Sequence, residues 1–286
     1  MLVRLLSNED NYLVYALTGN PNSLKSELGN NNTFFCGRWF FHENGCAEDV
    51  FSNACIINCA FPRNTDGANV AIGLEYINSL FCAAKDYHSR AVINISSQSV
   101  YSQKRTHMAD ENTSLCLESE YAIGKYATEL MLNSICRDLP HTNLRMSSLI
   151  GPYFNQRITN RLIDSIISEK RAIVSINKRR FGFMDVRDAS DAILSLIGIS
   201  PMVWKGVYCV GTGQGYSLME IADELYTITK NVLGFFPEIQ KIKTEEYGDT
   251  SVSGDLLKRD TGFYSRLSLY DSLQNIFLSK LDKSRK

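Results

Sequence analysis

Short apolar runs and longer stretches of helical periodicity alternate through the first half of the chain. The apolar runs predict buried strands at residues 12–17, 54–59, 91–95 and 143–149. Apolar residues spaced three and four apart predict helices over residues 69–85 and 120–136. Because strands that alternate with helices are typical of βαβ units, we predict an α/β fold built on a parallel sheet.

The pattern becomes less regular after the Gly151-Pro152 break. It predicts further helices near residues 158–168, 186–197 and 218–232, and further strands near residues 172–176 and 206–210. We find no low-complexity linker, so we expect two parts that interleave along the chain. Residues 1–6 have the pattern of an amphipathic helix, and the strand at residues 12–17 follows it almost at once.

Composition excludes several classes of protein. Hydrophobic residues make up 44% of the 286 and charged residues 21%, which is ordinary globular usage and excludes disorder and coiled coil. The formal net charge is −1 and there is no long run of one sign, which argues against broad electrostatic capture of nucleic acid. A compact anionic ligand is still compatible with this charge.

The eight cysteines are scattered, without paired CxxC spacing. We interpret them as reduced and mostly buried, and we interpret Cys55 and Cys59 as structural residues rather than metal ligands. No run approaches the roughly 20 apolar residues that cross a bilayer, and the N-terminus has no signal-peptide pattern. We therefore expect a soluble, cytoplasmic protein with no membrane partner and no metal.

Tyr121 and Lys125 are the most informative pair in the chain. Residues four apart lie on one face of a helix, where a lysine ammonium favours the phenolate and makes the tyrosine a usable general acid/base. The alternative is a solvated surface pair. Ser97 directly follows the strand at residues 91–95, so it falls at the carboxyl end of the sheet, where ligands of α/β proteins bind. We interpret Ser96 and Ser99 as turn or helix-capping hydroxyls.

The combined motifs resemble the extended short-chain dehydrogenase/reductase family, in its NAD-dependent epimerase/dehydratase group that acts on nucleotide sugars. The resemblance runs over nearly the whole chain. Besides Ser97, Tyr121 and Lys125, it rests on the segments Asn58–Ala60, Leu144–Pro152, Phe183–Ala189, Tyr208–Gly213, Ser217–Glu220, Asp255–Lys258 and Thr261–Phe263.

The resemblance implies a Rossmann-like, doubly wound parallel sheet with a smaller C-terminal substrate-binding part. Residues 1–151 would bind NAD or NADP, and residues 152–286 would mainly bind the nucleotide sugar, with 182–213 returning to the Rossmann-like part. It implies catalytic roles for Ser97, Tyr121 and Lys125, with Thr18, Asn58 and Ala60 as further cofactor contacts. It places Ser97, Ser148 and Arg180 at the substrate, and it implies a homodimer that pairs through helices 69–85 and 120–136.

The sequence departs from the family pattern in several places. The family's first strand and its Gly-x-x-Gly-x-x-Gly phosphate turn should precede Met1, so we expect this chain to bind the dinucleotide weakly or not at all. Thr18 offers neither an acid for a ribose 2′-hydroxyl nor an arginine for a 2′-phosphate, which leaves NAD and NADP both open. The family's pyrophosphate arginine falls at Phe181, so we assign that role to Arg180 or its neighbour Arg179; a solvated basic loop is the alternative.

Reaction class depends on the residues after Ser97. The family's 4,6-dehydratases carry an acidic pair there, whereas this chain has Gln98 and Ser99, which cannot do carboxylate chemistry. We therefore predict a nucleotide-sugar epimerase or 4-keto reductase. The competing hypothesis is a non-catalytic, family-derived protein or truncated gene product that does not bind cofactor.

Overall fold

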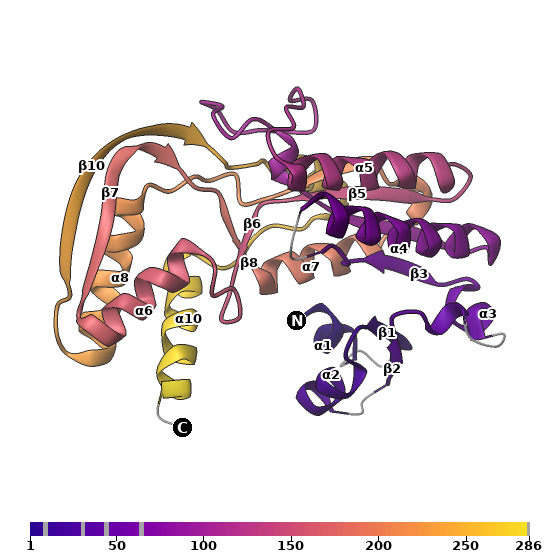
Figure 1. The fold of residues 1–286 in the computed structure, drawn as a ribbon, viewed down its shortest axis with the longest axis horizontal. Helices are drawn as coiled ribbons and strands as arrows, with labels where there is room; N and C mark the ends of the chain where they lie inside the picture. Colours follow the sequence, from indigo (N-terminus) through magenta and orange to yellow (C-terminus); the bar gives the residue numbers. More distant parts are fainter. Residues whose placement is uncertain (8–10, 30–31, 43–45, 63–65, 285–286) are drawn as a thin grey trace. The chain divides into compact units, whose positions relative to one another are not determined.

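A computed structural model of the chain describes residues 1–7, 11–29, 32–42, 46–62 and 66–284, and the chain divides into two compact units (Figure 1). The first unit comprises Met1–Ser96, Ser119–Leu144 and Ile193–Val207. The second comprises Ser97–Glu118, Arg145–Ala192 and Tyr208–Lys286. These boundaries separate two groups of residues that contact one another more than they contact the rest of the chain. The predicted division into a cofactor domain and a substrate domain concerns binding and stays a prediction.

The first unit opens with a parallel pair of strands. Helix α1 (Leu2–Ser7) precedes β1 (Val14–Thr18), which pairs with β2 (Thr33–Gly37) in the register Thr18↔Gly37. Between the strands runs α2 (Pro21–Leu28), whose start is fixed by Asn20: its side chain accepts a hydrogen bond of 3.1 Å from the Ser23 amide. The strand pair β1-β2 forms a sheet of its own.

A four-stranded sheet has the order β3-β4-β5-β9. Its strands are β3 (Cys55–Asn58), β4 (Ala91–Ser97), β5 (His141–Met146) and β9 (Val207–Val210), and β3 and β4 are parallel. Ala91, Val92 and Ile93 are fully buried, as in a central strand covered on both faces. The long helices α4 (Gly67–Asp86) and α5 (Glu120–Ile135) pack side by side and, with α3 (Cys46–Phe51), contribute side chains to one apolar core.

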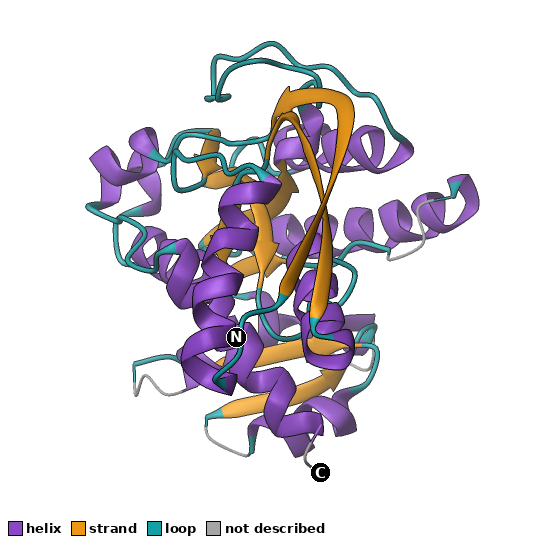
Figure 2. Cartoon of the chain, turned by 90° about the vertical axis from the view of Figure 1, so that its left-hand side faces the viewer, coloured by secondary structure: helices purple, strands orange, loops and turns teal. Residues whose placement is uncertain are grey.

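The second unit is built around a parallel ribbon of two long strands, β7 (Arg171–Arg180) and β10 (Glu238–Asp249), which curve past each other in Figure 2. Helices α6 (Ile158–Glu169) and α8 (Leu218–Leu233) pack on β7, and α10 (Leu269–Ser284) packs on both helices. A short pair, β6 (Ser148–Ile150) with β8 (Phe183–Asp185), leads into α7 (Val186–Ile197). A further short helix, α9, spans Asp255–Thr261.

Most of the predicted elements are confirmed, with small shifts of their ends, and two differ in a way that matters. The predicted strand 143–149 is two strands, because the chain leaves the four-stranded sheet after Met146 and pairs with β8 from Ser148 onward. The predicted strand 172–176 extends to Arg180, because it pairs with β10 along its whole length. Within the described residues, no helix is long and apolar enough to span a bilayer.

Candidate active site

Helix α5 carries Tyr121 and Lys125 one turn apart. Its start is fixed by Ser119, whose hydroxyl accepts a hydrogen bond of 3.2 Å from the Ala122 amide. Tyr121 therefore lies in the first turn of the helix and is half-buried. Lys125 is only 5% exposed, so the alternative of a solvated surface pair is wrong for the lysine.

The Lys125 ammonium is held by a backbone carbonyl and an aromatic ring. Its Nζ donates a hydrogen bond of 2.8 Å to the carbonyl oxygen of Ile95, near the carboxyl end of β4. The same atom lies 4.4 Å from the centre of the Phe61 ring and 6.0 Å from the centre of the Tyr121 ring. The Phe61 and Tyr121 rings meet edge to face, with centres 5.3 Å apart. The three side chains form one contact group, which we call the Phe61 cluster.

Burial lowers the pKa of Lys125 from its ordinary value of 10.5 to about 8, and the neighbouring Cys59 and Glu129 oppose that change by favouring the charged form. The lysine therefore still carries its proton near neutral pH. A protonated lysine beside a tyrosine favours the phenolate, which is the state that accepts a proton from an alcohol.

Glu129 lies one turn beyond Lys125 on α5 and is bonded to the strand beneath it. The Ser96 hydroxyl donates to its carboxylate at 2.5 Å, and both residues are almost fully buried. The interpretation of Ser96 as a turn or capping hydroxyl is therefore wrong, because its side chain joins β4 to α5. Sequence reasoning missed Glu129, although its position four residues after Lys125 was visible.

Ser97 is the last residue of β4 and caps the short 3-10 turn that follows it, Gln98–Val100. Its hydroxyl oxygen accepts hydrogen bonds from the Ser99 amide at 3.2 Å and the Ser99 hydroxyl at 3.0 Å. Both acceptor positions are thus used, and the Ser97 proton is left to donate to another oxygen. Ser97 belongs to the second unit and Tyr121 to the first, and their convergence on one substrate stays a prediction.

Asn58 and Ala60, two predicted cofactor contacts, are joined by a hydrogen bond after β3. The Ala60 amide donates to Asn58 Oδ1 at 3.1 Å, and Asn58 Nδ2 donates to Asn94 Oδ1 at 2.9 Å. Asn94 in turn donates to Asn143 Oδ1 at 2.9 Å and to the Thr128 hydroxyl at 3.0 Å. The Asn58 side chain thus belongs to a buried row of amides across β3, β4 and β5.

Thr18 is at the carboxyl end of β1, where its hydroxyl accepts a 3.4 Å hydrogen bond from the Asn20 amide. Arg38 follows β2, the strand that pairs with β1, and is exposed. A Cβ placed on Gly19 would lie 4.0 Å from Arg38 Nη2, so this cation sits directly beside the turn after Thr18. Sequence reasoning missed Arg38, because it did not predict β2.

In the second unit, Arg180 ends β7 and lines an open cavity of about 850 Å³ together with Lys178, Tyr247 and Asp249. Its guanidinium donates to the Gly215 carbonyl and lies 3.4 Å from Glu220, which caps α8. Arg179 instead reaches Glu246 at 3.8 Å. Ser148 opens β6, where it pairs with Phe183. The substrate roles of Arg180 and Ser148 stay predictions.

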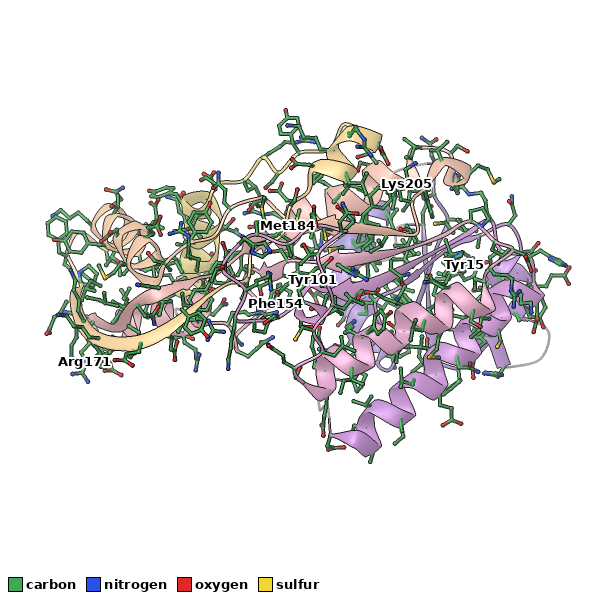
Figure 3. All side chains as sticks on the ribbon, turned by 90° about the horizontal axis from the view of Figure 1, so that it is seen from above. Tyr15, Tyr101, Phe154, Arg171, Met184 and Lys205 are labelled. Carbon is green, nitrogen blue, oxygen red and sulfur yellow. The ribbon has the colours of Figure 1, made fainter. Side chains whose placement is uncertain are left out.

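Tyr101, which is labelled in Figure 3, is fully buried and follows Ser97 closely in sequence. Its ring lies 5.7 Å from the Arg105 guanidinium and 5.2 Å from that of Arg145, and its hydroxyl accepts a 2.9 Å hydrogen bond from Arg145. Burial, together with the Cys209 thiol 3.2 Å away, nevertheless raises the pKa of Tyr101. This tyrosine stays protonated at neutral pH, which leaves Tyr121 as the candidate base.

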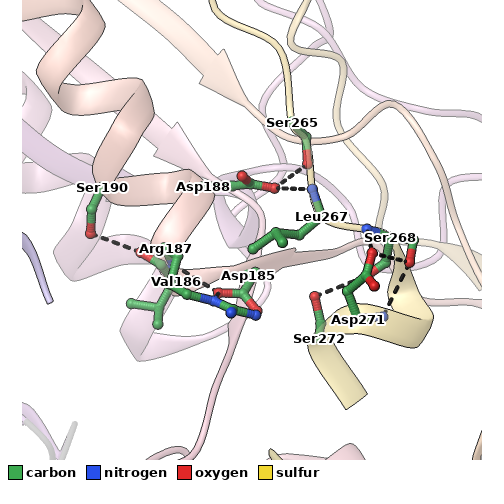
Figure 4. Close-up of polar contacts among 10 residues, drawn as sticks. All are labelled: Asp185, Val186, Arg187, Asp188, Ser190, Ser265, Leu267, Ser268, Asp271 and Ser272. Atoms are coloured by element: carbon green, nitrogen blue, oxygen red, sulfur yellow. Dashed lines mark hydrogen bonds and ion pairs between the residues drawn. The ribbon is translucent and has the colours of Figure 1, made fainter. Parts of the chain in front are cut away.

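The acidic residues of the segment Phe183–Ala189 have structural partners (Figure 4). Asp185 binds the Arg187 guanidinium through both carboxylate oxygens, at 2.8 and 2.9 Å. Asp188 accepts hydrogen bonds from the Ser265 hydroxyl at 2.5 Å and the Leu267 amide at 3.0 Å, which fastens the segment before α10. In the part of the chain that the structure describes, no cluster of His, Cys, Asp and Glu could hold a metal ion.

Comparison with known proteins identifies the family and the fold of the chain. The family model described as the NAD dependent epimerase/dehydratase family matches residues 2–211. The fold is similar to that of UDP-glucuronic acid 4-epimerase from Bacillus cereus, with a TM-score of 0.80, 18% identity, and coverage of 99% of this chain and 95% of that one. It is also similar to dTDP-glucose 4,6-dehydratase from Bacillus anthracis, with a TM-score of 0.77, 20% identity, and coverage of 99% and 92%. No curated protein matches.

These matches confirm the Rossmann-like α/β fold, the resemblance drawn from the motifs, and the prediction of an NAD-dependent enzyme family. The family match spans most of the chain, including the whole of α5 and the strands on either side of it. The chain belongs to the NAD dependent epimerase/dehydratase family.

Proposed function

We propose that the protein is an NAD(P)-dependent enzyme that epimerises or reduces a nucleotide sugar at one ring carbon, with Tyr121 as the general acid/base. The observation that carries the proposal is the Phe61 cluster, in which the buried Lys125 lies beside Tyr121 on α5. In the family to which the chain belongs, the reaction is redox chemistry on an alcohol. Such chemistry needs one group that takes the hydroxyl proton as the hydride leaves the carbon.

The described residues on the cofactor side fit a dinucleotide. Lys125 has three N–H donors and gives one to Ile95, so a ribose hydroxyl that reaches the small exposed part of this side chain would find a donor. The backbone after Asn58 and the turn after Thr18 lie at the carboxyl ends of β3 and β1, where α/β proteins bind nucleotides. A bound nicotinamide would supply the redox chemistry, which is hydride transfer from and to the sugar carbon.

The proton steps fall to this chain's own residues. Tyr121 takes the hydroxyl proton as the sugar carbon becomes a ketone, and it gives the proton back when the ketone is reduced. Lys125 stabilises the phenolate in between, and Ser97 donates its free proton to the reacting oxygen. If the hydride were returned to the opposite face of the ketone, the product would be the epimer. If a keto sugar were supplied, only the reduction would take place, with Tyr121 giving its proton to the ketone oxygen.

Dehydration is disfavoured by the residues after Ser97. Gln98 is 7% exposed and its amide oxygen accepts a 3.2 Å hydrogen bond from Arg105, while Ser99 is bonded to Ser97. Neither side chain has a carboxyl group to remove a hydroxyl as water. This supports epimerase or reductase chemistry over 4,6-dehydration.

Arg38 favours the 2′-phosphorylated form of the dinucleotide. A dinucleotide bound at the carboxyl end of β1 places its adenosine ribose at the turn after that strand, where this chain offers an arginine and no acid at Thr18. An arginine binds a phosphate through two parallel N–H donors, whereas it has no matching partner in a plain 2′-hydroxyl. This arrangement supports NADP as a cofactor beside the NAD that the description of the family names.

The cavity beside Arg180 supports binding of the nucleoside diphosphate part of a nucleotide sugar. Its lining combines the cations of Lys178 and Arg180 with the carboxylates of Glu245, Glu246 and Asp249, and it includes the exposed Tyr247 ring, on which a base can stack. Residues 152–286, apart from 182–213, would thus form the substrate-binding part. A homodimer through α4 and α5 is supported by their exposed apolar side chains, which include Ile72, Ile123 and Leu130.

The test is turnover of a panel of UDP- and dTDP-sugars with NAD or NADP, followed by chromatography and mass spectrometry. We expect a product of unchanged mass, or one heavier by two hydrogens when a keto sugar and reduced cofactor are supplied. The matched control, Tyr121→Phe, should lower turnover by a factor of about 100 or more. A product lighter by one water would overturn the reaction class, and unchanged turnover by Tyr121→Phe would overturn the role of Tyr121.

A further inference from the structure

Phe61 occupies an unusual place in the candidate site. It follows Asn58 and Ala60 at the end of β3 and is partly buried against the core of the first unit. Its ring contacts both members of the proton-transfer pair: the Lys125 ammonium faces it at 4.4 Å, and the Tyr121 ring meets it at 5.3 Å with an interplanar angle of 87°. A cation over a ring face and an edge-to-face ring pair are both favourable geometries.

Gly124, the buried residue immediately before Lys125 on α5, makes room for this ring. A Cβ on Gly124 would lie 2.8 Å from Phe61 Cζ and 3.1 Å from Val70 Cγ1. The first distance is shorter than carbon atoms tolerate, so any larger residue at position 124 must push the ring out. Phe61 and Gly124 are thus two halves of one fit.

The Phe61 ring also limits the access of water to the Lys125 ammonium. Lys125 is 5% exposed, and the groups around it are the Ile95 carbonyl, the Phe61 ring, the Tyr121 ring, Glu129 and Cys59. Glu129 and Cys59 favour the charged lysine, whereas burial opposes it. Phe61 is the largest apolar side chain in this set, so its removal lets water reach Nζ.

We infer that Phe61 is a positioning residue for proton transfer: seated against Gly124, it fixes Tyr121 and Lys125 relative to each other and keeps the ammonium dry. The role in proton transfer rests on the proposed function. The packing of Phe61 against Gly124 and Lys125 does not, because it is present in the unliganded chain. Phe61 acts through Tyr121 and Lys125 and takes no part in the bond changes.

The experiment measures the protonation of Lys125 directly, in full-length protein without substrate or cofactor. Only the neutral amine reacts with acetic anhydride, so the rate of acetylation of Lys125 against pH, followed by peptide mass spectrometry, reports its pKa. In Phe61→Ala we expect the apparent pKa of Lys125 to rise by about one, because rehydration of the ammonium outweighs the loss of its contact with the ring face. The rate at pH 7 should then fall about tenfold once accessibility is normalised to the high-pH plateau.

Two further variants keep the test informative. Phe61→Leu retains an apolar cover and should move the pKa less than Phe61→Ala. Gly124→Ala retains Phe61 but shifts its ring away from Lys125. It should therefore move the pKa of Lys125 in the same direction as Phe61→Ala. The matched control is Phe235→Ala, which removes a ring that lies 5.5 Å from Lys170 in the second unit and should leave Lys125 unchanged.

Folding of each variant is checked by circular dichroism and thermal unfolding. An unchanged Lys125 titration in folded Phe61→Ala and Gly124→Ala would overturn the inference. Turnover gives a separate readout: the basic limb of the pH profile of kcat/KM should move upward in Phe61→Ala, with a larger fall in kcat than rise in KM. If Lys125 titrates as expected while no nucleotide sugar reacts even in the unaltered protein, the proposed function fails and the packing of Phe61 against Gly124 and Lys125 stands.

Discussion

Replacement of Lys125 by methionine should make the protein more stable while abolishing its chemistry. Burial lowers the pKa of Lys125 from 10.5 to about 8, so the folded state binds this proton less tightly than the unfolded state does. At about 1.4 kcal/mol for each tenfold step, the charged lysine costs the folded state about 3 kcal/mol at pH 7. The 2.8 Å hydrogen bond from Lys125 to Ile95 stabilises the folded state and offsets part of this cost. Lys125→Met should therefore raise the free energy of unfolding by about 2 kcal/mol.

The sign of the pH dependence follows from the same linkage. Between about pH 8 and 10.5 the unfolded chain keeps a proton on this lysine that the folded chain has lost, so stability rises with pH in that window. The cost falls to about 2 kcal/mol at pH 9, and the advantage of Lys125→Met over the unaltered protein should therefore shrink by about 1 kcal/mol from pH 7 to pH 9.

Urea unfolding of both proteins at pH 7, 8 and 9, followed by circular dichroism, measures this difference. Burial raises the pKa of Cys55 to about 11 and that of Cys136 to about 12 in both proteins. The contribution of these thiols to the pH dependence of stability therefore cancels when the two proteins are compared. A Lys125→Met protein less stable than the unaltered one at pH 7, or an advantage that grows with pH, would refute the reasoning.

Two further predictions concern the first unit. Arg38→Ala should weaken binding of NADPH about tenfold and leave NADH unchanged in fluorescence titrations, because only the former has a 2′-phosphate for the guanidinium; equal losses for both would contradict this role. Asn94→Leu should lower the free energy of unfolding by about 3 kcal/mol in urea, because it leaves Asn58 and Asn143 buried without their amide partner, whereas a change within about 0.5 kcal/mol would show that the amide row contributes nothing.

Elements with a strong apolar pattern were predictable from the sequence. Strand β4 is apolar on both faces and α5 carries its apolar residues at helical spacing, so local pattern and final burial agree. Strand β10 was not predictable, because most of its side chains are exposed and what orders it is backbone pairing with β7. The break between β5 and β6 also has no local signal, since only the change of partner strand marks it.

The candidate site divides in the same way. The spacing of Tyr121 and Lys125 places them together through helix geometry alone, so the sequence suffices for that pair. Arg38 enters the site through the register of β1 with β2, and Phe61 through a glycine far along the chain. Residues that reach a site across tertiary contacts leave no mark in local periodicity.

The parallel pairing of β7 with β10 has a consequence for how the second unit folds. Parallel strands cannot close by a tight turn, and here roughly 60 residues, which include α8, must be made between the two; at about 5–20 residues per second this takes several seconds on the ribosome. Until β10 emerges, β7 has an open edge with Ile173 and Ile176 along it, and closing so long a loop is slow. Folding of this unit is therefore limited by the arrival of its second strand, and the unpaired β7 is the point at which the nascent chain is most exposed to aggregation.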